Sequence, residues 1–194
     1  MKNRILIIGD ELFGQEGQAA TLFSELLLSE NPTRPIQFAI YAPVKLTLSA
    51  LLSRAPADIL GKKAGRILLG VGLHELKTQM NAEKAFEAYH ALIQEILSKT
   101  TSVLYLVTIP QESLPEWASE VKALNAKLAA LDDNDRIHLL DFATCVAKYN
   151  ELQLERGKFA RSLYDESDQS TSLCHMLLGL FIQKQIFNTN KEIP

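Results

Sequence analysis

Five short runs of apolar residues, rich in β-branched side chains, recur along the chain at wide spacing. They are Ile5–Ile8, Ile36–Tyr41, Arg66–Val71, Val103–Thr108 and Ile137–Leu140. Each run is almost continuously apolar and is bounded by glycine, proline or charged residues, as is typical of strands buried on both faces of a parallel sheet. This pattern predicts an α/β fold, because the segments between the runs carry apolar residues at helical spacing.

The helical patterns alternate with the strand-like runs. The predicted helices are Glu16–Ser29, Asn81–Thr100, Ser113–Leu131 and Ser172–Phe187. Ser113 and Glu116 stand in capping-box register with Pro115 in the first turn, which predicts that the third helix begins at Ser113. The segment Phe142–Gln169 is mixed in charge, and we expect a helix followed by a loop there.

This alternation predicts one domain over residues 1–194, a three-layer α/β/α sandwich with right-handed crossovers. We expect a five-stranded parallel sheet in the flavodoxin-like order 2-1-3-4-5, with the first strand in its centre. A chain of 194 residues is long enough to bury a full core.

Composition excludes several classes of protein. The net charge of −3 gives no indication of binding to nucleic acid or to an anionic membrane surface. Cys145 and Cys174 form no disulfide framework by number or spacing, which fits a reducing compartment. No apolar stretch approaches the roughly 20 residues of a membrane span. We therefore predict a soluble, cytoplasmic protein without a cofactor; the sequence identifies neither a partner nor an oligomeric state.

Polar residues follow several of the predicted strands. In an open parallel sheet, ligands bind beyond the carboxyl ends of the strands, so these residues are candidates for a functional site. The candidate ligand-binding residues are Asp10, Ala42, Lys45, Gly72 and His175. Glu11, His74 and Asp168 stand in the same segments and are further candidates for the site.

The order of these segments resembles a known family. Gly9-Asp10-Glu11-Leu12, directly after the first strand, is similar to the opening Gly-Asp-Ser-Leu block of the GDSL or SGNH hydrolases, which are esterases, lipases and carbohydrate deacetylases. The later blocks of that family resemble FAIYAPVKLTLSALL, RILLGVGLHEL, LYLVTIP and SLYDESDQSTSLCHMLLGLFI in the same order along the chain. The resemblance covers essentially the whole chain and implies the SGNH-hydrolase type of α/β fold.

The resemblance also implies which residues stand at the family's catalytic positions. There a serine attacks the ester carbonyl, backbone N–H groups and an asparagine stabilise the oxyanion, and a histidine three residues after an aspartate is the base. The serine position falls on Glu11, the oxyanion glycine on Ala42 or Lys45, and the asparagine on His74. The aspartate falls on Asp165 or Asp168, and the histidine therefore on Asp168 or Thr171. Nucleophile and base are both replaced, and His175 lies about one turn beyond the expected base.

Three functional hypotheses follow from these residues. The first is a non-catalytic member of the SGNH fold that binds a small molecule or a protein partner. The second is an active ester or acetyl hydrolase whose catalytic groups are rebuilt. The third is a flavodoxin-like module with an acidic rim that binds a metal through oxygen and nitrogen ligands. The candidate ligands for that third hypothesis are Asp10, Glu11, His74, Glu75 and Asp168, although they match no recognised metal-binding spacing, and no metal site is predicted.

Glu11 and His74 are expected to lie close together at this edge of the sheet. His74, together with Glu75, is expected to pair with Glu11, with the imidazole proton shared between carboxylates. The simpler interpretation is that His74 only fills the space of the family's asparagine.

Overall fold

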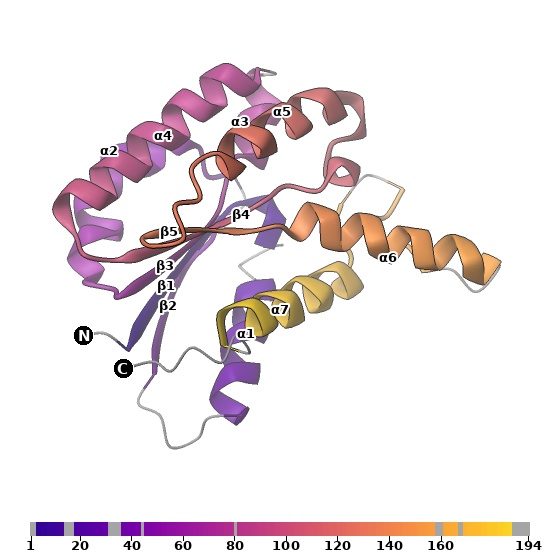
Figure 1. The fold of residues 1–194 in the computed structure, drawn as a ribbon, viewed down its shortest axis with the longest axis horizontal. Helices are drawn as coiled ribbons and strands as arrows, with labels where there is room; N and C mark the ends of the chain where they lie inside the picture. The colour runs from indigo at the N-terminus through magenta and orange to yellow at the C-terminus, as the bar shows by residue number, and fades with distance from the viewer. Residues whose placement is uncertain are drawn as a thin grey trace.

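The sheet has the architecture that the apolar runs predict. In the computed structural model, strands β1 (Arg4–Gly9), β2 (Gln37–Tyr41), β3 (Arg66–Gly70), β4 (Val103–Val107) and β5 (Ile137–Leu140) form one parallel sheet (Figure 1). Their order is β2-β1-β3-β4-β5, so the predicted topology is confirmed. The structure describes residues 3–13, 18–30, 36–43, 45–79, 81–157, 161–166 and 169–187.

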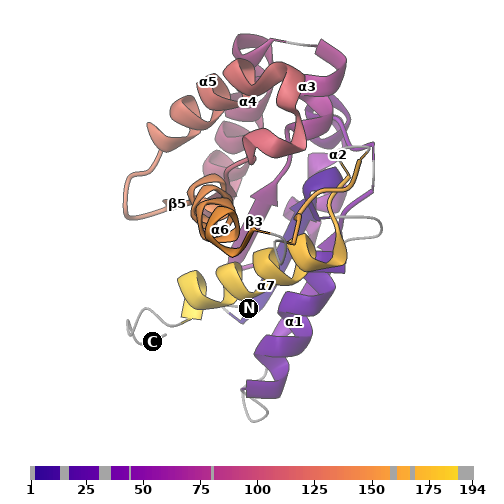
Figure 2. The ribbon, with the colours of Figure 1, turned by 90° about the vertical axis from the view of Figure 1, so that its right-hand side faces the viewer.

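Seven α-helices accompany the sheet within the described residues. They are α1 (Gln18–Glu30), α2 (Leu48–Asp58), α3 (Leu73–Gln79), α4 (Ala82–Lys99), α5 (Ala118–Ala129), α6 (Phe142–Arg156) and α7 (Ser172–Phe187). Helices α2, α4 and α5 cover one face of the sheet, and α1 and α7 lie together on the other (Figures 1 and 2). The predicted three-layer sandwich is therefore confirmed, and each face of the sheet has its own apolar core.

The amphipathic pattern of α4 shows how the sequence builds one of these layers. Asn81 caps the helix by accepting a hydrogen bond from the backbone N–H of Lys84 at 3.0 Å. Residues three or four apart along the helix, including Ala85, Tyr89 and Ile96, are fully buried against the sheet. The phenol of Tyr89 donates to the Leu69 carbonyl at 3.1 Å, which satisfies its buried polar atom.

The start of α5 differs from the sequence prediction. The predicted capping box at Ser113 is wrong, because α5 begins at Ala118 after two 3₁₀ turns, η4 (Gln111–Ser113) and η5 (Pro115–Trp117). The Ser113 hydroxyl donates back to the Pro110 carbonyl at 2.6 Å instead of accepting a forward N–H. The segment after β4 therefore forms part of the rim of the sheet rather than a longer helix.

A close contact fixes the turn that follows β1. The 3₁₀ turn η1 (Glu11–Phe13) places the buried Phe13 ring directly against the backbone of two neighbouring strands. A Cβ atom added at Gly70 would lie 1.9 Å from Cε2 of Phe13, and one at Gly9 would lie 2.4 Å from Cδ2. Only glycine fits at either strand end, so the Phe13 ring packs directly on the ends of β1 and β3 and holds η1 against the sheet.

Within the parts of the chain that the structure describes, no helix is both long and apolar enough to cross a membrane.

Candidate functional site at the carboxyl edge of the sheet

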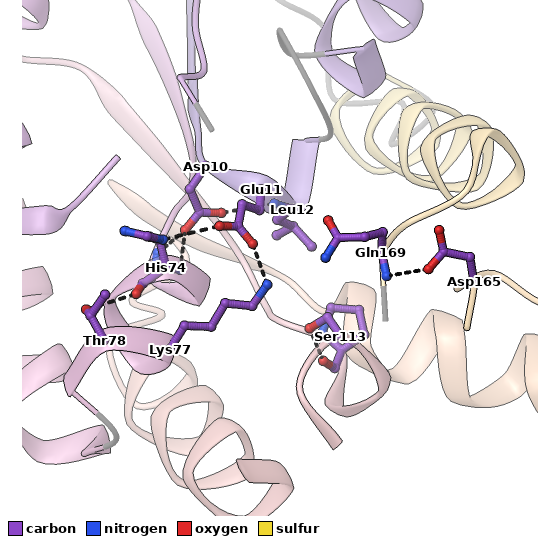
Figure 3. Close-up of polar contacts among 11 residues, drawn as sticks. Asp10, Glu11, Leu12, His74, Lys77, Thr78, Ser113, Asp165 and Gln169 are labelled. Atoms are coloured by element: carbon purple, nitrogen blue, oxygen red, sulfur yellow. Dashed lines mark hydrogen bonds and ion pairs between the residues drawn. The ribbon is translucent and has the colours of Figure 1, made fainter. Parts of the chain in front are cut away.

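Asp10 is the first residue after β1 and connects two segments of the rim. Its side chain is fully buried and accepts three backbone N–H groups, from Leu12 at 3.0 Å, Gly72 at 2.8 Å and His74 at 3.2 Å (Figure 3). The loop after β3 can donate twice to the same oxygen because Gly72 adopts a φ of 110°. Asp10 therefore joins η1 to the start of α3 and is not free to contact a ligand.

Burial dominates the electrostatics of this carboxyl group. The pKa of Asp10 is raised from 3.8 to about 6, chiefly by burial and to a smaller extent by the negative charge of Glu11. The three N–H donors act in the opposite direction and offset only part of the shift. Asp10 consequently changes charge close to neutral pH while it holds the loop.

Glu11 points toward the start of α3, where two side chains meet its carboxylate. Its Oε1 lies 3.2 Å from Nδ1 of His74, and its Oε2 forms an ion pair with the ammonium of Lys77 (Figure 3). The Glu11 side chain is 16% exposed and that of Lys77 is 27% exposed, so the pair is only partly screened by solvent. The structure thus brings Glu11 and His74 together and adds Lys77, which the sequence interpretation did not include.

Helix α3 explains why Lys77 was not recognised. His74 and Lys77 are three residues apart, so both project from the same side of the helix toward Glu11. The sequence interpretation assigned no helix to this short segment, although its i, i+3 spacing was the available signal. Glu75 projects elsewhere: it is buried, and its Oε2 accepts the Leu48 N–H at 3.1 Å at the start of α2. Glu75 was expected to share the His74 proton with Glu11, but its carboxylate instead contacts the start of α2.

The space beside Glu11 is small. A cavity of about 10 Å³ is lined by Glu11, Leu12, Leu73, Lys77, Ser113, Tyr164, Gln169 and Ser170. This volume holds about one water molecule. Tyr164 also lines a wider groove of about 440 Å³, so this residue forms part of the wall of both spaces. The groove is bounded by Gln111, Glu112, Pro115, Ala118, Asn150, Ser162, Leu163, Tyr164 and Asp165.

The remaining predicted site residues lie in different surroundings. Ala42 is buried in the core on the α1 and α7 face, Lys45 is exposed, and neither lines the small cavity. Gly72 contributes its N–H to Asp10, as described above. Asp168 lies outside the described residues. Within the described part of the chain, no group of three His, Cys, Asp or Glu side chains could hold a metal ion.

His175 lies in the first turns of α7, and it contacts a serine hydroxyl as a triad histidine does, but no partner orients its ring within the described residues. The side chain is 7% exposed, and its Nε2 lies 2.7 Å from the hydroxyl oxygen of Ser170. Its Nδ1 is buried and has no hydrogen-bond partner within the described residues. Thr171, a candidate position for the family's base, instead caps α7 through its hydroxyl, which accepts the Cys174 N–H at 3.4 Å.

Solved structures of esterases and lipases are similar to this structure. The structure is similar to an acetyl xylan esterase, AlAXEase, with a TM-score of 0.79, 18% identity and coverage of 94% of this chain and 99% of that one. It is also similar to the lipase/acylhydrolase from Enterococcus faecalis, with a TM-score of 0.71, 17% identity and coverage of 96% and 95%. A member of the lipolytic protein G-D-S-L family from Veillonella parvula DSM 2008 gives a TM-score of 0.73 at 13% identity, with coverage of 96% and 98%.

The fold is that of the SGNH hydrolases. No protein-family model and no curated protein matches the sequence. At 13–18% identity the structural likeness establishes the fold, and function has to be argued from the side chains at the rim.

Proposed function

We propose that this chain is a non-catalytic protein of the SGNH fold that binds a small molecule or a protein partner at the carboxyl edge of its sheet. The observation that carries the proposal is the carboxylate of Glu11, which the resemblance puts at the serine position and which is engaged by His74 and Lys77. An ester hydrolase needs a nucleophile at this position that can approach a carbonyl carbon.

The chemistry of Glu11 opposes ester hydrolysis in two ways. A tetrahedral intermediate places negative charge on the carbonyl oxygen, and an adjacent carboxylate repels that charge instead of stabilising it. In addition, both carboxylate oxygens of Glu11 already have partners, so an attack on a substrate would first have to break the contacts with His74 and Lys77.

The general base is also replaced in this interpretation. Of the two positions that the resemblance gives for the histidine, Thr171 is occupied with capping α7. Loss of one member of a catalytic triad typically lowers the rate by several orders of magnitude. Loss of two members leaves only the contributions of binding and of backbone donors.

Binding has a more suitable location beside this cluster. The groove of about 440 Å³ lies between η4, η5, α6 and the segment 162–165. Small-molecule sites commonly measure about 300–1,000 Å³. Apolar side chains such as Leu163 and Pro115 line it together with the polar Glu112 and Asn150, whose side chains are hydrogen-bonded at 2.7 Å. This mixture suits a ligand with an apolar body and a few polar groups.

Hydrolysis of p-nitrophenyl acetate tests the catalytic half of the proposal. We expect steady-state turnover by the wild type and by Glu11→Ser to equal the uncatalysed background, with an active GDSL lipase as the positive control. Steady turnover by the wild type would contradict the proposal and support an active ester or acetyl hydrolase with rebuilt groups. Turnover gained by Glu11→Ser alone would show that a competent base is already in place.

A thermal-shift screen of small molecules tests the binding half. Ala118 lines the groove at the first turn of α5, so Ala118→Trp should fill the groove and abolish the shift of any hit. Hits that persist unchanged in this variant would contradict the location.

A further inference from the structure

The pair formed by Ser170 and His175 has no counterpart among the catalytic positions that the resemblance assigns. The two polar atoms, Oγ of Ser170 and Nε2 of His175, lie 2.7 Å apart. Local structure holds both residues in place: Ser170 forms an antiparallel bridge with Tyr164, and the His175 N–H donates to the Thr171 carbonyl at 3.1 Å. The pair is therefore built by the first turn of α7 and the strand-like segment that precedes it.

The surroundings of the pair suit proton transfer. Burial lowers the pKa of His175 from its ordinary value of 6.5, and no charged side chain of the described residues contributes to this shift. The imidazole is consequently neutral at neutral pH and can accept a proton. Ser170 is only partly buried and lines the small cavity together with Lys77, whereas His175 is buried and does not line it.

We propose that Ser170 is a nucleophile, activated by His175, that accepts an acyl or phosphonyl group from an ester or a similarly activated donor. In this step, Oγ attacks the carbonyl carbon while Nε2 takes the hydroxyl proton. The bond between the carbonyl carbon and the leaving oxygen then breaks, and the leaving alcohol departs with the proton from Nε2. The product is an ester on Ser170. This inference goes beyond the proposed function, because it adds a single covalent capture to a protein that does not turn over.

The same geometry explains why the captured group should remain attached. Hydrolysis of the ester needs a water molecule activated by His175, and a cavity of about 10 Å³ has no room for that water once the acyl group is attached to Ser170. A triad also needs a third group to orient the histidine, and Nδ1 of His175 has no such partner in the described residues. An acyl donor would approach from the side of the wider groove, which shares Tyr164 with the cavity as a lining residue.

Labelling with a fluorophosphonate probe tests the inference directly. In this reaction Oγ bonds to phosphorus, fluoride leaves and Nε2 takes the proton. We expect intact-mass spectrometry to show one adduct per chain and peptide mapping to locate it at Ser170. Ser170→Ala should remove the adduct, whereas Ser172→Ala, at an exposed serine two residues further along, should retain it. Absence of labelling in the wild type, or an adduct at another residue, would overturn the inference.

The role of His175 has its own readout. His175→Gln should slow labelling by about 100-fold or more, as expected for loss of a general base. In the wild type, the labelling rate should fall as pH drops through the pKa of His175, below the ordinary value of 6.5. A purely structural hydrogen bond would produce no such profile, so a rate that follows only the probe's own pH dependence would overturn the role of His175. These results are independent of the turnover test, which monitors steady-state hydrolysis.

Discussion

Two polar clusters at the same edge of the sheet differ in charge and in the way they are held. The cluster of Glu11, His74 and Lys77 is ionic, and it is positioned by the turn after β1 and the start of α3. The pair of Ser170 and His175 forms no ion pair with any other described residue and is positioned by the start of α7. Glu11, Lys77 and Ser170 nevertheless line one small cavity. The comparison shows that one cavity is lined by an ion pair from the β1 and α3 side and by a serine hydroxyl from the start of α7.

The first cluster rests on closely packed backbone, and the largest expected effect is on stability there. Gly70→Ala would place a Cβ atom 1.9 Å from the Phe13 ring, and we expect the free energy of unfolding to fall by about 3 kcal/mol. The measurement is chemical denaturation of the variant and the wild type. Replacing Phe13 by Leu in the Gly70→Ala background should restore part of the loss.

A matched glycine in α7 provides the control. The nearest atoms to a Cβ at Gly179 lie 3.4–3.5 Å away, on Leu22 and Ala19, and alanine favours a helix by roughly 1 kcal/mol over glycine. Gly179→Ala should therefore leave stability unchanged or raise it slightly. If Gly70→Ala and Gly179→Ala lower the free energy of unfolding equally, the two regions do not differ in packing as the structure indicates.

The second prediction concerns the pH dependence of stability through Asp10. Its pKa is about 6 in the folded protein and 3.8 ordinarily, so between these values the folded state binds the proton more tightly. Stability from this group is present at low pH and is lost as pH rises through about 6. Relative to Asp10→Asn, the wild type should therefore gain about 1–2 kcal/mol when the pH falls from about 7 to about 4.5. A difference between the two proteins that stays constant over this range would contradict the raised pKa.

A smaller effect is expected for the ion pair of Glu11 and Lys77. A double-mutant cycle with Glu11→Gln and Lys77→Met should give a coupling energy of about 1 kcal/mol, because the two side chains are 16% and 27% exposed. High salt should reduce the coupling, since water reaches part of the pair. Additive effects of the two substitutions would mean that Lys77 does not hold Glu11 in solution.

The sequence predicted the sheet more successfully than the helices. All five apolar runs are strands, because short, mostly apolar runs bounded by glycine, proline or charge favour a parallel sheet. Burial on both faces holds for the inner strands β1 and β3, whereas the edge strands β2 and β5 are partly exposed. Helix α3 is short and carries His74, Glu75 and Lys77, so it gave no clear apolar stripe. The start of α5 was misplaced because the Ser113 hydroxyl bonds backward to Pro110.

The site was predictable only where topology fixed it. Strands β1 and β3 are neighbours, so residues that directly follow them, Glu11 and His74, come together. Lys77 depended on a helix that was not recognised. Ser170 depended on the path of a loop and on the direction of one side chain, and neither is encoded in residue spacing.

The release of p-nitrophenolate from p-nitrophenyl acetate, counted per chain, tests the central claim most directly. A site closed by Glu11, with at most one covalent capture at Ser170, predicts no more than one equivalent of product above the uncatalysed background, followed by no further release. Glu11→Ser should behave in the same way. Continuous release of many equivalents by the folded wild type would contradict the account, because it would require a complete catalytic cycle at this rim.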